Sequence, residues 1–399
     1  MKNLKSDFPI FANNPWLVYL DNGASTQKPQ SVIDSVSDFV SKDYANIHRG
    51  LYSLSERSEE IYHKSKEELA KLINCKASEI IYTYNSTYGI NIIAQTLANS
   101  WMLKKWDNVL LGIWEHHSDI LPWMILSETF WFWIRFIEIW NDYDINWNDF
   151  DSKYDDTVKL VACAQVSNVT WCIYDVKKLK SKLNPKTFFL IDWSQSVPNI
   201  EVDLQDIWCD CLVFTWHKMM AYNGIWVIYL KLDRIKKLMP MFGWWWTVQD
   251  VSQDDYQFVS TNEKFESWTP NIIWAVSLLA AVEYIKSIWW MKYIRQNELE
   301  LINYVLDKFK SLWDKVNLIW PAMAENRVGV FSFNVPGNKN QNTLWEIFAE
   351  KNICVRCGGH CAYPLHKFLD KKWTCRMSLY VYNDKEDIDQ FFQVLKKLS

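Results

Sequence analysis

Short apolar runs alternate with longer amphipathic segments along most of the chain. The runs are rich in β-branched and aromatic residues and several end at a polar residue, which is typical of buried strands. The expected strands are Leu17–Leu20, Ile80–Tyr84, Asn108–Gly112, Val158–Ala164, Phe188–Asp192, Cys211–Thr215 and Trp226–Leu230. The expected helices include Gln30–Lys42, Glu56–Ile73 and Asn271–Ile288. This alternation predicts an α/β fold with a mostly parallel sheet flanked by helices.

The pattern changes near Met291, where a long amphipathic helix is expected to begin. Strands are then expected at Val328–Asn334 and Ile353–Val355, and a final helix at Lys385–Leu398. We therefore expect a large domain over residues 15–290 and a smaller α+β C-terminal domain over residues 291–399 that includes the loop around Cys361. Residues 1–14 would complete the small domain.

The overall charge excludes some classes of partner. With 43 basic and 47 acidic residues the net charge is −4, so no concentrated basic surface for nucleic acid is indicated. The most apolar stretch, residues 121–140, is interrupted by Glu128, Arg135 and Glu138, which argues against a membrane span. Nine cysteines are spread along the chain without a secretory leader, and this spacing is typical of reduced thiols in the cytoplasm.

Tryptophan is abnormally frequent, with 25 residues against only 10 glycines. Several tryptophans occupy positions where the backbone favours glycine, such as Trp106 in a turn, Trp216 after a strand, the run Trp244–Trp246, and Trp289 and Trp290 at a helix end. We hypothesise that UGA codons specify glycine in the gene and are translated here as tryptophan. If all were, glycine would make up 35 of 399 residues, about 9%, which is close to the ordinary usage of about 7%. The alternative is a tryptophan-rich protein with an aromatic surface. The codons would distinguish the two.

Two expected strands end close to chemically useful residues. Asp192 ends one strand, and Lys218 follows the next strand by three positions. Ligands of open α/β sheets bind beyond the carboxyl ends of the strands, so the two side chains would face one crevice. An acid and a lysine are what pyridoxal phosphate (PLP) chemistry requires, since the lysine forms a Schiff base and the acid keeps the pyridine nitrogen protonated. A structural ion pair is the alternative.

The residues around this pair resemble those of aminotransferase class V enzymes. Thr215-Trp216-His217-Lys218 resembles the Ser/Thr-Gly-His-Lys signature of that family, with tryptophan in place of glycine. The segment Ile191–Ser196 resembles Val-Asp-Gly-Ala-Gln-Ser, again with tryptophan at the glycine. The resemblance implies fold type I of PLP-dependent transferases.

Further stretches resemble the group II (SufS-like) cysteine desulfurases within that family. Residues 115–123 are similar to Glu-His-His-x-Asn-x-x-Pro-Trp, with Asp119 at the asparagine, and residues 355–362 are similar to Arg-x-Gly-x-His-Cys-Ala. The other similar stretches are residues 46–50, 166–169, 265–271 and 375–379. The matches run in order from about residue 20 to residue 383, and Trp171, Trp193, Trp216 and Trp268 all fall on family glycines.

The resemblance implies a role for each matching residue. Lys218 would bind the cofactor and move protons, Asp192 would pair with the pyridine nitrogen, and His116 would stack on the ring. The other implied cofactor contacts are Gln195 to the ring oxygen, Asn168, and Ser86, Thr87, Thr215 and His217 to the phosphate. Thr269 would reach the phosphate of a neighbouring subunit. Arg376, Arg356 and Asn168 would bind the substrate, with Arg376 gripping the carboxylate of cysteine.

Cys361 would be the residue that accepts sulfur, because a thiolate is favoured near the cationic Arg356 and its loop is polar. Attack on the sulfur of L-cysteine would leave a persulfide on Cys361 and release alanine. A metal site made by Cys354, Cys357, Cys361 and His360 is an alternative, although the usual second pair of ligands is absent nearby, and we expect no metal. Cys357, not usual for the family, could pair with Cys361.

The resemblance thus implies a homodimeric cysteine desulfurase that passes sulfur to a SufE- or SufU-like acceptor for iron–sulfur cluster assembly. A selenocysteine lyase, another class V enzyme and a non-catalytic scaffold are the alternatives. Tyr84-Asn85, Gln165 and Asn223 depart from the family pattern, which leaves fine cofactor contacts open. If the tryptophans are genuine, Trp216 would crowd Lys218, and Trp193 and Trp268 would be as difficult to accommodate.

Overall fold

The structure is a computed structural model that describes residues 4–48, 50–244, 246–267, 269–288, 290–312, 314–319, 323–337 and 340–398. Four residues discussed above, Arg49, Trp245, Trp268 and Trp289, lie outside these ranges, as does the side chain of Trp290.

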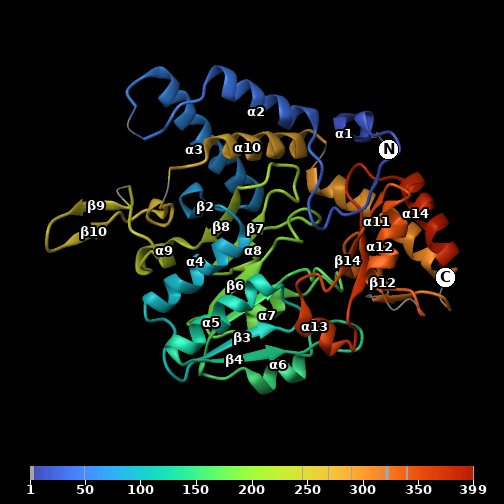
Figure 1. The fold of residues 1–399 in the computed structure, drawn as a ribbon. Helices are drawn as coiled ribbons and strands as arrows, with labels where there is room; N and C mark the ends of the chain where they lie inside the picture. Colours follow the sequence, from blue (N-terminus) through green and yellow to red (C-terminus); the bar gives the residue numbers. More distant parts are fainter. Residues whose placement is uncertain are drawn as a thin grey trace.

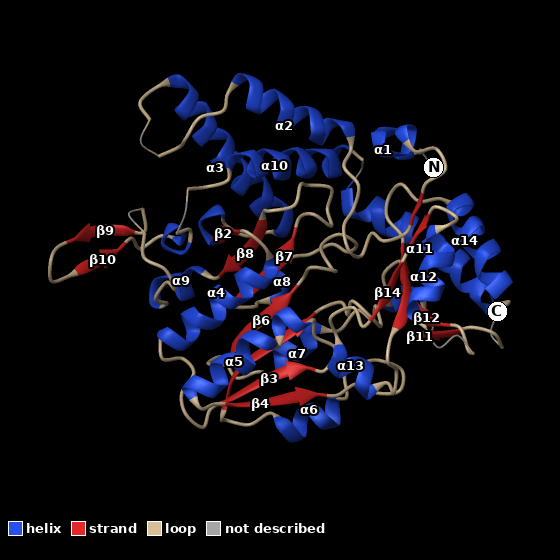
Figure 2. Ribbon diagram, viewed as in Figure 1, coloured by secondary structure: helices blue, strands red, loops and turns tan. Residues whose placement is uncertain are grey.

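A seven-stranded sheet forms the centre of the larger part of the molecule (Figures 1 and 2). Its order is β2 (Ile80–Thr83), β8 (Trp226–Leu230), β7 (Cys211–Thr215), β6 (Phe188–Asp192), β5 (Val158–Ala164), β3 (Asn108–Gly112) and β4 (Trp133–Ile137). All neighbours are parallel except that β8 runs antiparallel to β2 and β7. The predicted α/β fold with a mostly parallel sheet is confirmed.

Alternation along the strands explains why helices cover both faces. Leu110 of β3 belongs to one hydrophobic cluster, whereas its neighbours Val109 and Leu111 belong to another. The helices on one face are α2 (Gln30–Lys42), α3 (Ser53–Ile73), α6 (Trp147–Lys153), α7 (Val176–Lys182), α8 (Leu204–Ile207) and α10 (Ile272–Ser287), and those on the other are α4 (Ser86–Asn99), α5 (Leu121–Phe130) and α9 (Leu232–Lys237). Successive side chains of a strand point to opposite faces, so both faces of this sheet are buried.

A second, antiparallel sheet lies beside the first (Figure 2). Its order is β11 (Asn317–Ile319), β12 (Val330–Asn334), β15 (Thr374–Ser378) and β14 (Arg356–Gly358). Three helices pack on it in a separate hydrophobic cluster, namely α11 (Trp290–Lys310), α12 (Gln341–Ala349) and α14 (Lys385–Leu398). The short α13 (Tyr363–Phe368) follows β14.

The N-terminal segment joins the two parts of the molecule. Leu17–Leu20 was expected in the large sheet, but β1 (Val18–Tyr19) pairs in parallel with β13 (Ile353–Cys354), and Val18 and Leu20 pack in the cluster of the second sheet. The strand in this run is only two residues long. The apolar residues of the run therefore indicate that it is buried, but not which sheet it joins. The division of the chain at residues 290 and 291 stays a prediction.

The remaining elements are short. They are η1 (Leu4–Asp7), α1 (Pro9–Asn13), η2 (Ala77–Glu79), η3 (His117–Asp119), η4 (Asn262–Phe265), η5 (Ala324–Asn326) and the hairpin of β9 (Val248–Val251) and β10 (Tyr256–Phe258), which projects from the molecule in Figure 1. Across the described ranges no single helix has the length and apolar character for crossing a membrane. The bent pair Ile272–Ser287 and Lys292–Lys310 meets that test by length and composition alone.

Candidate active site

A cavity of about 210 Å³ opens where β5, β6 and β7 end and the second sheet approaches them. Eleven of the residues singled out from the sequence line it, namely Ser86, His116, Asn168, Asp192, Gln195, Thr215, His217, Lys218, Arg356, Cys361 and Arg376. Thr87 and Thr269 do not line it, although Thr87 follows Ser86 in the first turn of α4. The carboxyl edge of a parallel sheet therefore gathers the predicted site, as it does in other open α/β folds.

Lys218 and Asp192 share the floor of this cavity. Asp192 is the last residue of β6, only 7% exposed, and its Oδ1 accepts a hydrogen bond from the backbone N–H of Ser194 at 2.7 Å. Burial lowers the pKa of Lys218 to about 8, although the charge of Asp192 opposes the change. Burial also raises the pKa of Asp192. The lysine thus gives up its proton far more easily than a solvated amine does.

His116 is held in one orientation by the turn that follows it. Its Nδ1 accepts a hydrogen bond from the backbone N–H of Ser118 at 3.1 Å and contacts the Ser118 hydroxyl at 2.7 Å. Burial and the neighbouring Lys218 lower the pKa of His116 to about 4. Burial likewise lowers the pKa of His217 to about 3. Both imidazoles are therefore neutral at physiological pH.

Several buried polar atoms of the cavity have no hydrogen-bond partner among the described residues. They are the hydroxyls of Ser194 and Thr215, Oδ1 of Asn168 and Nε of Arg376. Buried polar groups are normally paired, so this set indicates a site shaped for a polar ligand. Ser86, the first residue of α4, adds a hydroxyl at a helix start, where anions are favoured.

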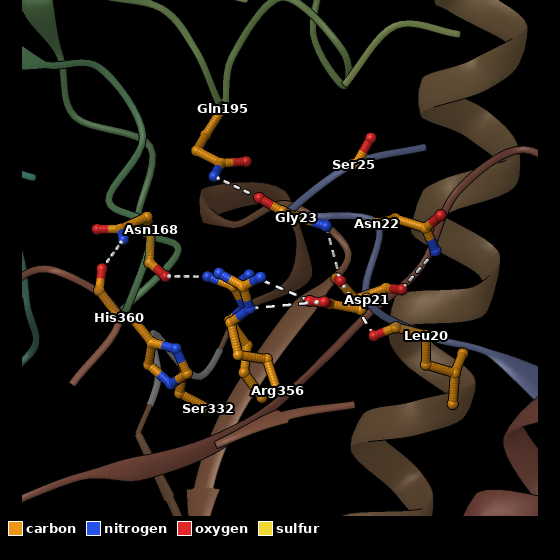
Figure 3. Close-up of polar contacts among 12 residues, drawn as sticks. Leu20, Asp21, Asn22, Gly23, Ser25, Asn168, Gln195, Ser332, Arg356 and His360 are labelled. Atoms are coloured by element: carbon orange, nitrogen blue, oxygen red, sulfur yellow. Dashed lines mark hydrogen bonds and ion pairs between the residues drawn. The ribbon is translucent and has the colours of Figure 1, made fainter. Parts of the chain in front are cut away.

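Two arginines of the second sheet, Arg356 and Arg376, line the cavity, and Figure 3 labels Arg356. Arg376, fully buried at the centre of β15, donates from Nη1 to the carbonyl of Asn168 at 3.3 Å and from Nη2 to Asp21 Oδ1 at 3.4 Å. Arg356 forms an ion pair with the other oxygen of Asp21 at 3.5 Å. Burial lowers the pKa of Arg376 to about 10, and Asp21 partly offsets this. One carboxylate therefore positions both guanidinium groups.

Asp21 and Gly23 were missed in the sequence. Gln195 donates from Nε2 to the carbonyl of Gly23 at 3.0 Å, and Asn168 donates from Nδ2 to the carbonyl of His360 at 2.6 Å (Figure 3). Asp21 directly follows the apolar run Leu17–Leu20, just as Asp192 ends its strand. An acid at the end of an apolar run was therefore a usable signal, applied above only to Asp192.

Cys361 is exposed at the rim of the cavity on a loop with unusual backbone geometry. His360 and Cys361 both have left-handed conformations, with φ of 48° and 56°, and Gly358 has φ of 146°. The carbonyl of Cys361 accepts a hydrogen bond from the N–H of His117 at 2.7 Å. Non-glycine residues with positive φ are uncommon and cluster at functional sites, so this loop is held in a specific shape.

Cys357 does not face Cys361. Its buried Sγ lies 2.7 Å from Sγ of Cys375 on the neighbouring strand, and it does not line the cavity. Within the described ranges, no group of three or more histidine, cysteine, aspartate or glutamate side chains could hold a metal ion. The alternative of a metal site at this loop therefore gains no support from the geometry.

The expectation that tryptophans would crowd the cavity is wrong for Trp193 and Trp216. Both are fully buried, but neither lines the cavity, and both pack in the hydrophobic cluster that includes Phe214. The indole N–H groups of Trp193 and Trp216 have no acceptor among the described residues. The hydrophobic cluster thus accommodates both indoles outside the cavity, at the expense of two unpaired donors.

Comparisons with known proteins agree with this geometry. Residues 18–391 match the model of the family Aminotransferase class-V. A probable cysteine desulfurase of Synechocystis sp. is 33% identical over 98% of this chain and 94% of its own length, and the cysteine desulfurase of Wigglesworthia glossinidia brevipalpis is 32% identical over 100% and 97%.

Solved structures lead to the same group. The apo structure of the cysteine desulfurase from Thermococcus onnurineus superposes with a TM-score of 0.93 at 31% identity and covers 100% of this chain and 97% of that chain. The Escherichia coli cysteine desulfurase CsdA, 24% identical with a TM-score of 0.89 over 99% and 97%, shows the shared fold. The chain therefore belongs to the class V aminotransferase family and, within it, to the cysteine desulfurases.

Proposed function

We propose that the protein is a PLP-dependent cysteine desulfurase that converts L-cysteine to L-alanine and retains the sulfur as a persulfide on Cys361. One observation carries the proposal: a single cavity contains a partly buried lysine of lowered pKa beside a buried acid and ends at an exposed thiol. A structural ion pair would need neither the cavity nor the thiol.

Pyridoxal 5′-phosphate fits the residues present. Lys218 would hold it covalently, Asp192 would face its pyridine nitrogen, and His116 would cover the ring. Gln195 and Asn168 would contact the ring, and Ser86, Thr87, Thr215 and His217 would hold the phosphate, for which the unpaired hydroxyl of Thr215 supplies a donor. When bound, the cofactor supplies an electron sink that stabilises negative charge at the substrate's carbon atoms.

The chain's own side chains would carry the remaining steps. Lys218, neutral near pH 8, removes a proton from Cα of the substrate and later returns protons to carbon. The thiolate of Cys361 bonds to the substrate's sulfur as the bond from that sulfur to Cβ breaks, which leaves a persulfide and, after protonation of Cβ, alanine. Neutral His116 is placed to shuttle a proton at this stage.

Arg376 would bind the carboxylate of cysteine. Its guanidinium is buried, lines the cavity and has an unpaired Nε–H, so a carboxylate would satisfy a donor that the protein leaves open. A planar guanidinium binds a carboxylate through two parallel hydrogen bonds. Arg356 lies on the same side and Asp21 neutralises part of the combined charge.

The group II subtype is the finer part of the proposal. The resemblance of residues 355–362 to the group II motif supports it, as does the exposure of Cys361, which leaves its sulfur accessible to a SufE- or SufU-like acceptor. Such a homodimer would work in the cytoplasm and supply iron–sulfur cluster assembly. Thr269, exposed and outside the cavity of its own chain, is the residue we assign to the partner subunit's phosphate.

Alanine release from L-cysteine tests the function directly. The PLP-loaded protein should release alanine and accumulate persulfide, and Cys361→Ala should do neither at a comparable rate while still binding the cofactor. Equal release by both proteins would move the assignment to another class V reaction. A strong preference for selenocysteine over cysteine would assign a selenocysteine lyase, and failure to bind the cofactor would favour a non-catalytic role.

We also propose that many of the tryptophans stand at glycine codons. Five of them adopt left-handed backbone conformations with φ between 57° and 76°, namely Trp101, Trp106, Trp131, Trp171 and Trp208. This conformation costs about 1–2 kcal/mol for a residue with a Cβ and nothing for glycine. The unpaired indole N–H groups of Trp193, Trp216 and Trp226 support the same view.

Codons and stability both test this idea, and UGG codons at these positions would refute it. Trp208→Gly should raise the free energy of unfolding by about 1 kcal/mol, because it relieves the left-handed backbone of a residue that is 61% exposed. Trp16→Gly is the matched control, since Trp16 is 60% exposed against 61% for Trp208 and is absent from the residues with positive φ. Trp16→Gly should not raise the free energy of unfolding.

A further inference from the structure

Two carboxyl groups lie buried together beneath the cavity. Glu115 directly precedes His116, and Asp119 ends η3 at the start of the segment that leads into α5; both are 0% exposed. Gly112 leaves room for this arrangement, because a Cβ there would meet Glu115 Oε1 at 2.6 Å and Trp114 at 2.5 Å. The proposed chemistry above uses neither acid.

The hydrogen bonds around the pair are incomplete. Both oxygens of Glu115 accept from the backbone N–H of Ala164, at 2.9 and 2.8 Å. Oδ1 of Asp119 accepts from Nε1 of Trp123 at 3.2 Å, but its Oδ2 is buried without a donor among the described residues. The side chains of Glu115 and Asp119 are within hydrogen-bonding reach of each other. Two carboxylates cannot form that bond unless one of them carries a proton.

The groups that face the pair from other elements supply no positive charge. They are Asp192 at the end of β6, Cys163 on β5, Cys211 on β7 and Tyr174 in the loop after β5. No ion pair joins Glu115 or Asp119 to a lysine or arginine in the part of the chain that the structure describes. A second full charge here would lie against Asp192 without compensation.

We propose that Glu115 and Asp119 share one proton, and that this acid pair positions Ala164 and limits the negative charge beside Asp192. Ala164 pairs with Asp192 across β5 and β6, lines the cavity, and accepts a hydrogen bond from Trp114 Nε1 at 2.9 Å. The pair therefore acts on the site through the end of β5. Where the similar family stretch has asparagine, this chain has Asp119, and an amide there could donate the same hydrogen bond without a stored proton.

The electrostatics agree with the geometry. Burial raises the pKa of Asp119 to about 8, and the negative charge of Asp192 acts in the same direction. Burial and Asp119 also raise the pKa of Glu115 well above its usual range. Two close carboxyl groups that cannot both ionise lose their protons in separate steps, and both shifts act against ionisation, so the pair keeps at least one proton at neutral pH.

Infrared difference spectroscopy of the holoenzyme tests for the proton itself. At pH 6 the parent should show the carbonyl band of a buried, protonated carboxyl group that Asp119→Asn removes. Glu115→Gln is the second variant and should remove the same band, because the amide that it introduces can donate to Asp119 in place of the shared proton. Persistence of the band in both variants would overturn the proposal.

Thermal unfolding against pH gives an independent reading. Because the folded pKa of Asp119 lies above its unfolded value, the contribution to stability is complete below about pH 4 and is lost as pH rises toward about 8. The ratio of folded to unfolded parent should fall by up to about tenfold per pH unit from this site, and Asp119→Asn should lack that decline. Identical pH profiles for parent and variant would contradict a shared proton.

The effect of the acid pair on catalysis rests on the proposed function, whereas the infrared and unfolding experiments do not. Ionisation of the pair above about pH 8 would add negative charge beside Asp192, so the alkaline limb of alanine release should move to higher pH in Asp119→Asn. An unchanged limb together with loss of the infrared band would confine the pair to a structural role. An inactive parent that still shows the band would count against the desulfurase and not against the proton.

Discussion

The two walls of the cavity differ in how they hold their chemical groups. The wall made by the large sheet carries the buried Asp192 and the partly buried Lys218 at or just beyond strand ends, and the surroundings displace the pKa values of both. The wall made by the small sheet ends in the loop of Cys361, which is exposed and held by left-handed backbone and a few hydrogen bonds. The side chains that exchange protons are thus largely shielded from solvent and fixed in place, whereas the thiol of Cys361, which must pass its sulfur onward, is exposed to solvent.

The largest expected effect comes from removing the amine of Lys218 on the wall made by the large sheet. Lys218→Ala should reduce alanine release by about 10³-fold or more, because both covalent attachment and proton transfer are lost. Lys28→Ala is the matched control, since burial also lowers the pKa of Lys28 to about 8 but it lies outside the cavity. A comparable loss of alanine release in Lys28→Ala would show that the effect does not depend on the position of Lys218 in the cavity.

A second pair of variants compares the two arginines on the wall made by the small sheet. Arg376→Lys should reduce kcat/KM for cysteine by about 10- to 100-fold, mainly through KM, because a lysine cannot bind a carboxylate through two parallel bonds. Arg356→Lys should have an effect of about twofold, since the side chain of Arg356 is 47% exposed and that of Arg376 only 3%. Steady-state kinetics would reverse the assignment if Arg356→Lys were the more damaging.

The lowered pKa of Lys218 should make PLP uptake by the apoprotein depend on pH. The rate at which the apoprotein takes up PLP should rise by about tenfold per pH unit and level off above about pH 8, since only the neutral amine attacks. Asp192 supports the protonated form, so Asp192→Asn should move the midpoint to lower pH. Stopped-flow absorbance would measure both, and a midpoint near the ordinary lysine pKa of 10.5 would contradict this account.

The smallest effect is expected at Cys357. Because its Sγ faces Cys375 and not the cavity, Cys357→Ala should change alanine release by less than about twofold, as is usual for a conservative change away from the reacting atoms. Persulfide mapping by mass spectrometry would place the sulfur on Cys361 alone. Sulfur found on Cys357 in the parent would mean that sulfur moves from Cys361 into the core of the second sheet.

The two walls also differ in how well the sequence predicts them. Five strands of the large sheet have the bounds expected from their apolar runs, and the strand ends identified Asp192 and Lys218. The strands β14 and β15 were not expected, because their residues carry no clear alternation and their pairing is between distant segments. Gly23 was missed because its place depends on β1 pairing with β13, whereas Asp21 follows an apolar run and could have been found by the signal that identified Asp192. The burial of Trp216 outside the cavity depends on core packing, which a local pattern does not encode.

The bond between the N–H of Gly23 and the hydroxyl of Ser378 spans 355 positions of the chain. During synthesis the segment that carries Asp21 and Gly23 leaves the ribosome early and waits for β13 and β15, which come near the end of translation. The large sheet has all of its strands before then, so the domain can fold while its cavity lacks a wall. The cavity is therefore completed only when the last tenth or so of the chain is made, and a truncated product would be folded in part and unable to bind substrate.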